Sequence, residues 1–446
     1  MKRRILLTLA ALLALFAMLG CGSAQNAATG GEGADASGGD SDEKITLTFA
    51  NRLLETSTDG SVISHRQMID EFVKENPNVE ISEESLQDPT YKTKIKTLAA
   101  GHDLPDVFEL IGSDAQMFLD NGLLMPLDDI LENDPEWKGG FIPSTIENFR
   151  VNGQVTGAPM QLLSTSLIYY NEAIFKEVGI DAFPATWPEF IAAVEKLQAG
   201  GYIPIAMGNK GNWLAESCIL SALGDRYTGT EWFESIMTKG GAKFTDQPFV
   251  DALKALQSLS QMGAFNTDLN SIDNAQQRTL YYNGKAAMFF EGNWAISSVT
   301  TDAPPEIRDN THLAILPTVE GGAGKANATS GGAAWSFAIN ADLEGEKLEA
   351  AIALVKKLTG KDHANFAAEN NTVAAVVADN YDESKVSPLF KEYLDMVKEL
   401  EMTPIYDAQL TPAVIETMNN GLQELLVGAV TPEQLAENIQ RTYESQ

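Results

Sequence analysis

The chain alternates between strand and helix patterns from residue 45 onward. Residues 45–50 alternate apolar and polar side chains as a strand does, and residues 64–74 carry apolar side chains at helical spacing. Asn76 and Pro77 end that helix, and residues 79–82 form the next short strand pattern. A strand, a helix and a second strand in this order form a β-α-β unit, so the sequence predicts an α/β fold with a parallel sheet.

The same alternation continues along the chain. Residues 91–100 are predicted as a helix that ends at Gly101, residues 106–111 as a strand, and residues 114–121 as a helix that ends at Gly122. A folded part of about 400 residues exceeds the usual size of one domain, so we expect two or three domains with sizeable cores.

The first residues predict export. Basic residues 2–4 precede an apolar run at residues 5–19, which is too short to span a bilayer and has the charge order of a secretory signal peptide. Residues 18–21 (MLGC) resemble the lipobox of bacterial lipoproteins. We therefore expect cleavage of the signal peptide 1–20 and lipidation of Cys21. The protein would then be anchored on the extracellular face of the cytoplasmic membrane in a Gram-positive cell, or lie in the periplasm of a Gram-negative one.

Composition narrows the possible partners. Residues 21–44 are a mixture of Gly, Ala, Ser and Asp without periodicity, which predicts a flexible tether after the lipidated cysteine. The formal net charge of −31 makes nucleic acid an improbable partner, because proteins bind nucleic acid by neutralising its phosphates. Solubility outside the cell is enough to explain this acidity.

Cysteine and histidine usage predicts neither a disulfide nor a metal site. If Cys21 is lipidated, Cys218 is the remaining cysteine and is expected to be a small buried hydrophobe. The four histidines are scattered without the spacing of metal ligands. We expect no cofactor and no bound metal.

Several segments together resemble one protein family. They follow the family's order and spread over most of residues 45–446: PDVFELIGSDAQMFLDNGLLMPLDD (105–129), GAPMQLLSTSLIYYNEAIFKEVGI and FPATWPEF (within 157–190), NGKAAMFFEGNW (283–294), and GG before WSFAIN (331–340). They look like the family 1 extracellular solute-binding proteins of ABC importers, the carbohydrate-binding, maltose-binding-protein-like group.

The resemblance implies a two-lobe periplasmic-binding-protein-like fold of the class II type. Each α/β lobe would be discontinuous in sequence, with hinge crossings between the lobes and the ligand trapped where they close. Carried onto this chain, lobe one would hold residues 45–157 and 286–330, and lobe two residues 158–285 and 331–446.

Three tryptophans are candidate ligand contacts. Sugars present a flat C–H face, so a sugar site needs aromatic rings as well as hydrogen-bonding groups. Trp294 follows the strand-like residues 285–290, and ligands of open α/β sheets bind at the carboxyl ends of strands. The resemblance marks the same tryptophan as a sugar-stacking position, and it adds Trp213 in a Gly- and Asn-rich loop. Trp335 follows a Gly-Gly pair and is an open case between ligand contact and plain strand entry.

Polar residues on the same loops are the second group of candidates. For each of them, an exposed loop position is the alternative to ligand contact. Asn51, Glu55 and Asp114 follow predicted strands, and Asn209 and Glu291 accompany the tryptophans. The resemblance adds Asp407, which precedes a helix that presents an aromatic residue in some members of the family.

Two other tryptophans are expected to be structural. Thr186 and Glu189 have the spacing of a capping box, so Trp187 is predicted to start a helix. Trp232 lies in a helix-like segment and is predicted to pack in a core.

The resemblance implies a binding lipoprotein rather than an enzyme. The protein would be a monomer that captures a mono- or oligosaccharide and presents it to the transmembrane subunits of an ABC permease. The tyrosine pairs at 169–170 and 281–282 keep ferric iron open as a rival ligand, and a polyamine is another. A solute sensor on the same fold remains an alternative. A glycoside-active enzyme is a less favoured alternative, because no pair of carboxylates stands out among 62 acidic residues.

Overall fold

The computed structural model describes residues 44–446, so the expected signal peptide, Cys21 and nearly all of the tether lie outside the described residues. Within 44–446, the helices are too short or too polar to cross a membrane. One sheet has five strands in the order β2-β1-β3-β13-β6. Their bounds are β1 Ile45–Asn51, β2 Val79–Ser85, β3 Val107–Ile111, β6 Ala158–Pro159 and β13 Trp335–Ile339.

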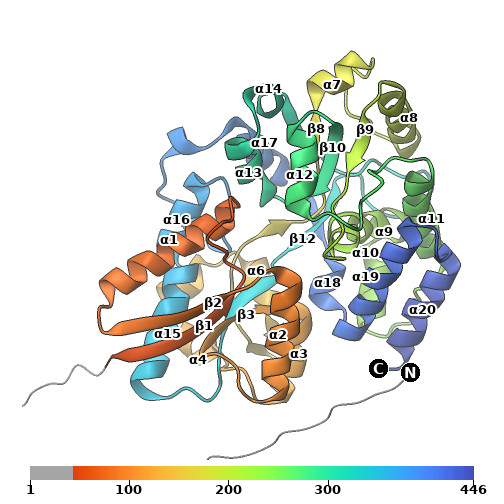
Figure 1. The fold of residues 1–446 in the computed structure, drawn as a ribbon. Coiled ribbons are helices and arrows are strands. Elements are labelled where there is room, and N and C mark those ends of the chain that lie inside the picture. Colours follow the sequence, from red (N-terminus) through yellow and green to blue (C-terminus); the bar gives the residue numbers. More distant parts are fainter. Residues whose placement is uncertain (1–43) are drawn as a thin grey trace, which may run out of the picture. The chain divides into compact units, whose positions relative to one another are not determined.

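We call this sheet and its helices the first lobe. β1 is parallel to β2 and β3, whereas β13 is antiparallel to β3 and β6. The lobe's other elements are α1 Gly60–Glu75, α2 Asp88–Ala100, α3 Gly112–Asp120, α4 Asp128–Glu132, α5 Pro135–Gly140, α6 Pro143–Glu147, β4 Arg150–Val151, β5 Gln154–Val155, α15 Gly345–Thr359 and α16 Lys361–Glu369. Figure 1 shows α15 and α16 beside α1 and β1, although more than 250 residues separate them in sequence.

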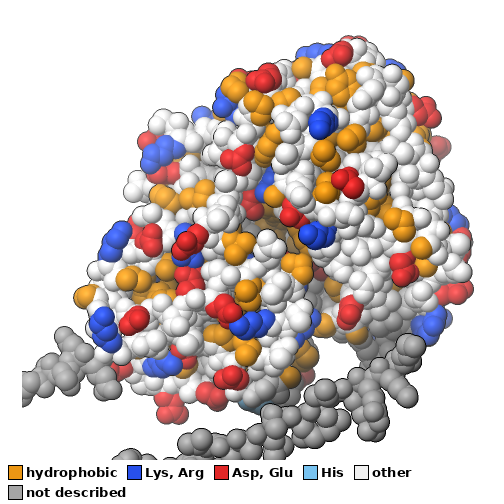
Figure 2. Space-filling model, in the orientation of Figure 1, with side chains coloured by type: hydrophobic (Ala, Val, Ile, Leu, Met, Phe, Trp, Pro, Cys, Tyr) orange, Lys and Arg blue, Asp and Glu red, His pale blue; other side chains and the backbone are white. Residues whose placement is uncertain are grey.

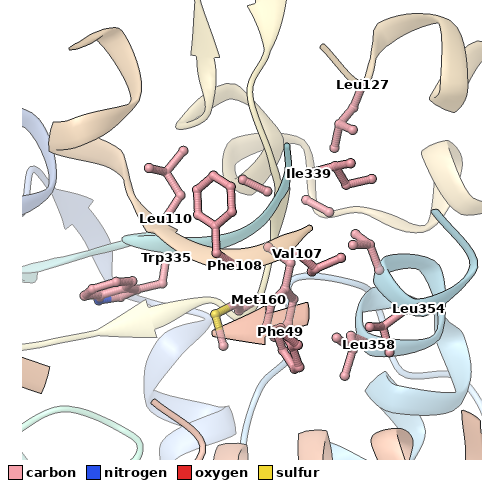
Figure 3. Packing of buried hydrophobic residues seen from close by; sticks show 14 of the residues in the cluster. Phe49, Val107, Phe108, Leu110, Leu127, Met160, Trp335, Ile339, Leu354 and Leu358 are labelled. Atoms are coloured by element: carbon pink, nitrogen blue, oxygen red, sulfur yellow. The ribbon is translucent and has the colours of Figure 1, made fainter. Parts of the chain in front are cut away.

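The first core lies on both faces of this sheet. Alternate residues of a strand point to opposite faces, so Phe49 and Phe108 lie on opposite sides. In Figure 3, Leu354 and Leu358 of α15 approach Phe49, away from Phe108. All four are fully buried, and Phe49 also packs against Phe337 with ring centroids 5.8 Å apart. The late segment that contains β13 and α15 is therefore part of the first core.

The second lobe is built on a four-stranded sheet in the order β11-β8-β10-β9. β9 and β10 are parallel, and β8 is antiparallel to β10 and β11. The strands are β8 Leu167–Asn171, β9 Ile203–Ala206, β10 Ala286–Glu291 and β11 Thr311–Ala314. The helices are α7 Glu172–Glu177, α8 Trp187–Ala199, the π-helix η1 Ala215–Leu220, α9 Ser221–Thr228, α10 Thr230–Met237, α11 Gln247–Gln261, α12 Asn274–Tyr282, α13 Ala295–Asp302, α14 Pro305–Arg308, the 3₁₀ turn η2 Glu383–Lys385, α17 Pro388–Val397, α18 Tyr406–Gln409, α19 Pro412–Leu426 and α20 Pro432–Glu444.

A small third sheet lies where the chain passes between the lobes. It contains β7 Leu163–Ser164, β12 Ala328–Gly332 and β14 Glu401–Thr403. Ser330 bonds the hydroxyls of Thr165 and Ser166 at 2.7 and 2.6 Å, and all three are buried. The crossings are thus held together by hydrogen bonds between buried hydroxyl groups.

The strand pairing differs from the expected partition of the lobes. We expected residues 286–330 in lobe one, but β10 pairs with β8 and β9, and β11 pairs with β8. The start of the expected 331–446 segment also differs, because β13 joins β3 and β6. Both bounds were carried over from the family resemblance by position in the sequence, whereas the pairing between distant strands is decided by tertiary packing.

Local predictions agree better with the structure. The β-α-β prediction is confirmed by β1, α1 and the parallel pairing of β1 with β2. The capping box of Thr186 and Glu189 is present at the start of α8. Trp232 stacks on Phe249 with ring centroids 5.1 Å apart, as expected for a packing residue. Cys218 is fully buried.

One buried arginine fastens the connection between β11 and β12. Arg226 on α9 is 1% exposed, and its guanidinium donates to the backbone oxygens of Leu316 (2.9 and 3.1 Å), Lys325, Ala326 (3.3 Å) and Ala328 (2.6 Å). Burial lowers the pKa of Arg226 from its ordinary value. The side chain acts as a hydrogen-bonding hub for a segment without regular secondary structure of its own.

Two stacked histidines predict loss of stability in acid. His65 on α1 and His363 on α16 are buried, with ring centroids 4.0 Å apart, and burial lowers the pKa of His65 to about 4. The unfolded chain takes up a proton near pH 6.5, whereas the folded chain does so only near pH 4. Stability should therefore fall as the pH drops from 6.5 to 4, by about 3 kcal/mol for His65 alone.

Urea unfolding at pH 7.5 and pH 5 measures this effect. We expect His65→Gln to reduce the difference in unfolding free energy between the two pH values. The matched control is His102→Gln, because His102 is exposed. Equal pH differences in wild type, His65→Gln and His102→Gln would contradict the prediction.

Candidate functional site

The topology brings the loop-bearing edges of the two sheets together. In the first sheet, β1, β2 and β3 end at the edge where the antiparallel β13 begins, since Trp335 pairs with Ile111. In the second sheet, β10 ends at Glu291, which pairs with Leu167 at the start of β8. Because the crossings at β7 and β12 lead directly into β8 and β13, these edges face each other. Figure 2 shows a hollow in the surface between the two lobes.

The lobes touch at the rim of this site. A Cβ on Gly112, at the start of α3, would lie 2.7 Å from the backbone oxygen of Ala408 on α18, so a side chain there would collide with the other lobe. A Cβ on Gly211, in the second lobe, would lie 3.7 Å from Pro89 of α2 in the first lobe.

Two of the predicted tryptophans meet in the second lobe. The rings of Trp213 and Trp294 lie 6.1 Å apart at 57°, and both side chains are partly exposed. Trp213 follows β9, and Trp294 caps the start of α13. A Cβ on Gly292 would lie 2.1 Å from the Trp294 ring, so only glycine leaves room for the indole in this orientation. The pair forms an angled aromatic wall.

Glu291 holds Trp294 in place. Its Oε1 accepts hydrogen bonds from Trp294 Nε1 (2.9 Å), Asn274 Nδ2 (2.7 Å) and Arg278 Nη1 (3.0 Å). Burial raises the pKa of Glu291, and the positive charge of Arg278 opposes that rise. Glu291 was predicted as a ligand contact, and its bonds within the protein favour a role in orienting the indole.

The third predicted tryptophan is covered by a cation. Trp335 is 8% exposed, and the guanidinium carbon of Arg52 lies 3.4 Å above the centre of its ring. Lys92 Nζ lies 5.4 Å from the same ring, and Tyr91 packs edge-on against it. Cations are attracted to the face of an indole ring. One face of Trp335 is therefore occupied by a neighbouring side chain.

Arg52, Asp88 and Lys92 form a charged network that sequence reasoning missed. Arg52 Nε lies 2.6 Å from Glu109 Oε2, and Asp88 lies 3.1 Å from both Arg52 and Lys92. The side chains of Arg52, Asp88 and Lys92 are 21, 24 and 26% exposed, so they line the site without being sealed off. Arg52 directly follows the predicted Asn51, but nothing in the helical pattern distinguishes Lys92 from an ordinary surface lysine.

Buried carboxyl groups complete the site. Asp407, on α18, and Asp114, on α3, are 8 and 1% exposed, and burial raises the pKa of each. Lys92 opposes the rise at Asp407, and Lys96 opposes it at Asp114 from 3.4 Å. Glu216, on η1, is fully buried, and burial raises its pKa well above the usual range. Glu216 was not predicted.

The remaining predicted residues have other surroundings. Asn51 is buried and uses its amide within its own lobe, with Glu83 (2.7 Å), Ser85 (2.8 Å) and the Leu53 amide (2.9 Å). Asn209 is also buried and accepts from the backbone of Ala215, which favours a role in shaping the Trp213 loop. The Glu55 side chain is 83% exposed, 3.5 Å from Arg66.

Solved structures share this architecture. A structure from work on xylan utilization by the thermophilic bacterium Caldanaerobius polysaccharolyticus is 27% identical, with a TM-score of 0.81 over 89% of this chain and 99% of that one. A chitin oligosaccharide binding protein is 26% identical, with a TM-score of 0.82 over 90% of this chain and 99% of that one. The fold is that of periplasmic solute-binding proteins.

Sequence comparison leads to the family. The multiple sugar-binding protein of Streptococcus mutans is 22% identical over 269 residues, which cover 59% of this chain and 60% of that protein. The match thus spans less than two thirds of that relative. The family described as bacterial extracellular solute-binding protein matches residues 63–365, more than half of the chain. The chain belongs to the family of bacterial extracellular solute-binding proteins.

Proposed function

We propose that this protein captures a mono- or oligosaccharide between its two lobes and presents it to the transmembrane subunits of an ABC permease. The observation that carries the proposal is the angled wall of Trp213 and Trp294 in the second lobe, together with a network of half-buried charged side chains in the first lobe. The indoles suit the C–H faces of sugar rings, and the carboxylates and cations suit the hydroxyl groups around them.

The stacking and hydrogen-bonding groups of the site can account for micromolar affinity for a sugar. A micromolar complex requires about −8 kcal/mol, and each charged hydrogen bond contributes about 1.5–3 kcal/mol when water is excluded. Closure of the lobes would supply that exclusion. Two structural relatives above 25% identity come from a chitin oligosaccharide binding protein and from work on xylan utilization, which supports an oligosaccharide as ligand.

Transport and anchoring are further parts of the proposal. Membership of an extracellular family supports action outside the cytoplasm, where lipidated Cys21 would tether the protein to the membrane as a monomer. ATP hydrolysis would take place on other subunits, and the bound sugar would be released chemically unchanged. A sensor that binds the same sugar without delivering it is the alternative use of this site.

Ferric iron is a weaker candidate ligand. Tyr169 is buried, donates a hydrogen bond to the backbone oxygen of Gly292 (2.8 Å), and stacks on Phe289. Tyr281 bonds Thr311 in the core at 2.8 Å. Burial raises the pKa of both phenols, which disfavours the phenolates that iron would need. Neither tyrosine lies on the tryptophan wall.

A ligand panel tests the proposal. Melting and intrinsic tryptophan fluorescence would be measured with neutral oligosaccharides, amino acids, polyamines and ferric salt. A sugar at 100 times its Kd should stabilise the fold by about 2.7 kcal/mol, a shift of several degrees in Tm, and should change the fluorescence. If only a polyamine, an amino acid or ferric iron acts, the sugar assignment is wrong. Chromatography of the recovered sugar separates binding from hydrolysis.

A further inference from the structure

A continuous chain of polar contacts connects the first lobe to Trp294. Arg278, on α12, lies 3.2 Å from Asp59 through Nη2 and 3.0 Å from Glu291 through Nη1. Glu291 in turn accepts the hydrogen bond from Trp294 Nε1 at 2.9 Å. Asp59 precedes α1 in the first lobe, whereas the other three residues belong to the second lobe.

The contact around Asp59 is part of a hydrogen-bonded interface between the lobes. Ser298 on α13 donates a hydrogen bond to Asp59 Oδ1 at 2.7 Å, and Ser297 donates to the backbone oxygen of Thr58 at 3.2 Å. Thr58 also donates to Asp302 Oδ2 at 2.7 Å. The loop before α1 therefore rests on α13, the helix that Trp294 begins.

Burial makes these charges depend on one another. The Arg278 side chain is 8% exposed and that of Glu291 is fully buried, so each compensates the buried charge of the other. Asp59, at 22%, is the partly exposed member. A guanidinium can bond two carboxylates at once through different nitrogens, which fixes its orientation. Loss of Asp59 would leave Arg278 oriented by Glu291 alone.

We propose that Arg278 and Glu291 are positioning residues for the Trp294 indole, and that Asp59 makes this positioning depend on contact between the lobes. The inference rests on the proposed function, in which Trp294 stacks on a sugar. Separation of the lobes would remove Asp59 from Arg278 and loosen the ring. Contact between the lobes would restore the ring to its stacking orientation.

Tryptophan fluorescence of the full chain without sugar tests the link directly. The Trp294 contribution is the difference between spectra recorded with and without Trp294→Phe. We expect Asp59→Asn to shift that contribution to longer wavelength and to increase its quenching by acrylamide. Arg278→Lys keeps the positive charge but lacks the guanidinium that bonds two carboxylates at once. It should therefore cause the same red shift and the same increase in quenching. Circular dichroism establishes that each variant is folded.

Asp302→Asn is the matched control, because it weakens the same interface without touching Arg278. An equal spectral change in Asp302→Asn, or none in either Asp59→Asn or Arg278→Lys, would overturn the proposal. With a sugar that the panel identifies, Asp59→Asn should weaken binding about 3- to 30-fold, and this loss should vanish in the Trp294→Phe background. If no sugar binds, the proposed function fails, while the fluorescence result still decides the link.

Discussion

Trp294→Ala should reduce carbohydrate affinity by about 2–4 kcal/mol, which corresponds to about 30- to 1,000-fold in Kd. The substitution removes the more firmly held half of the aromatic wall, and it leaves Glu291 without one of its hydrogen-bond donors. Titration calorimetry with the sugar that gives the largest thermal shift measures the effect. The melting temperature without sugar should also fall, because the indole packs against buried side chains of both lobes. Affinity is therefore measured well below the melting temperature of the variant.

Trp232→Phe is the control for this result. Trp232 stacks on Phe249 in the second lobe and donates a hydrogen bond to Asp246 at 3.0 Å. Its replacement should leave sugar affinity unchanged. If Trp294→Ala binds the sugar as tightly as the wild type does, the stacking assignment is wrong and the ligand contacts must be sought elsewhere.

Arg226→Met should lower the free energy of unfolding by about 3–5 kcal/mol and the melting temperature by about 5 °C. Methionine keeps much of the side-chain volume but donates no hydrogen bond. The backbone oxygens of Leu316 and Ala328 therefore lose a buried donor, and those of Lys325 and Ala326 lose a part-buried one. Urea unfolding measures the change. Arg308→Met is the matched control, because the side chain of Arg308 is 40% exposed and bonds its neighbour Asp309. A loss below about 1 kcal/mol in Arg226→Met would contradict the role of a hydrogen-bonding hub.

Local patterns predicted much of the fold because they report on residues near in sequence. The β1-α1-β2 unit and the capping box of α8 follow from periodicity and capping chemistry. The lobe assignment of residues 286–330 came from the family resemblance, and the observed sheet differs from it. The pairing of a strand such as β10 depends on which distant strands it can reach in the folded chain. Local periodicity carries no information about that choice.

In the candidate site too, some residues could be found from local sequence and others only from the tertiary structure. Trp294 and Glu291 lie three residues apart and bond each other, so one loop motif was enough to find both. Arg52, Asp88 and Lys92 meet because β1 and α2 are neighbours in space. Each of these three has an ordinary sequence context, and only tertiary structure shows that they converge on Trp335 and its surroundings.

The interleaving of the lobes has a consequence for how the protein is made. The first core needs Leu354 and Leu358 from α15 as well as strands β1 to β3, so a nascent chain cannot complete it until about residue 360 has emerged. Contacts between such distant segments also slow folding, because long loops must close first. The N-terminal half therefore lacks its complete core throughout most of synthesis, a state that suits passage through a translocation channel for extended chains.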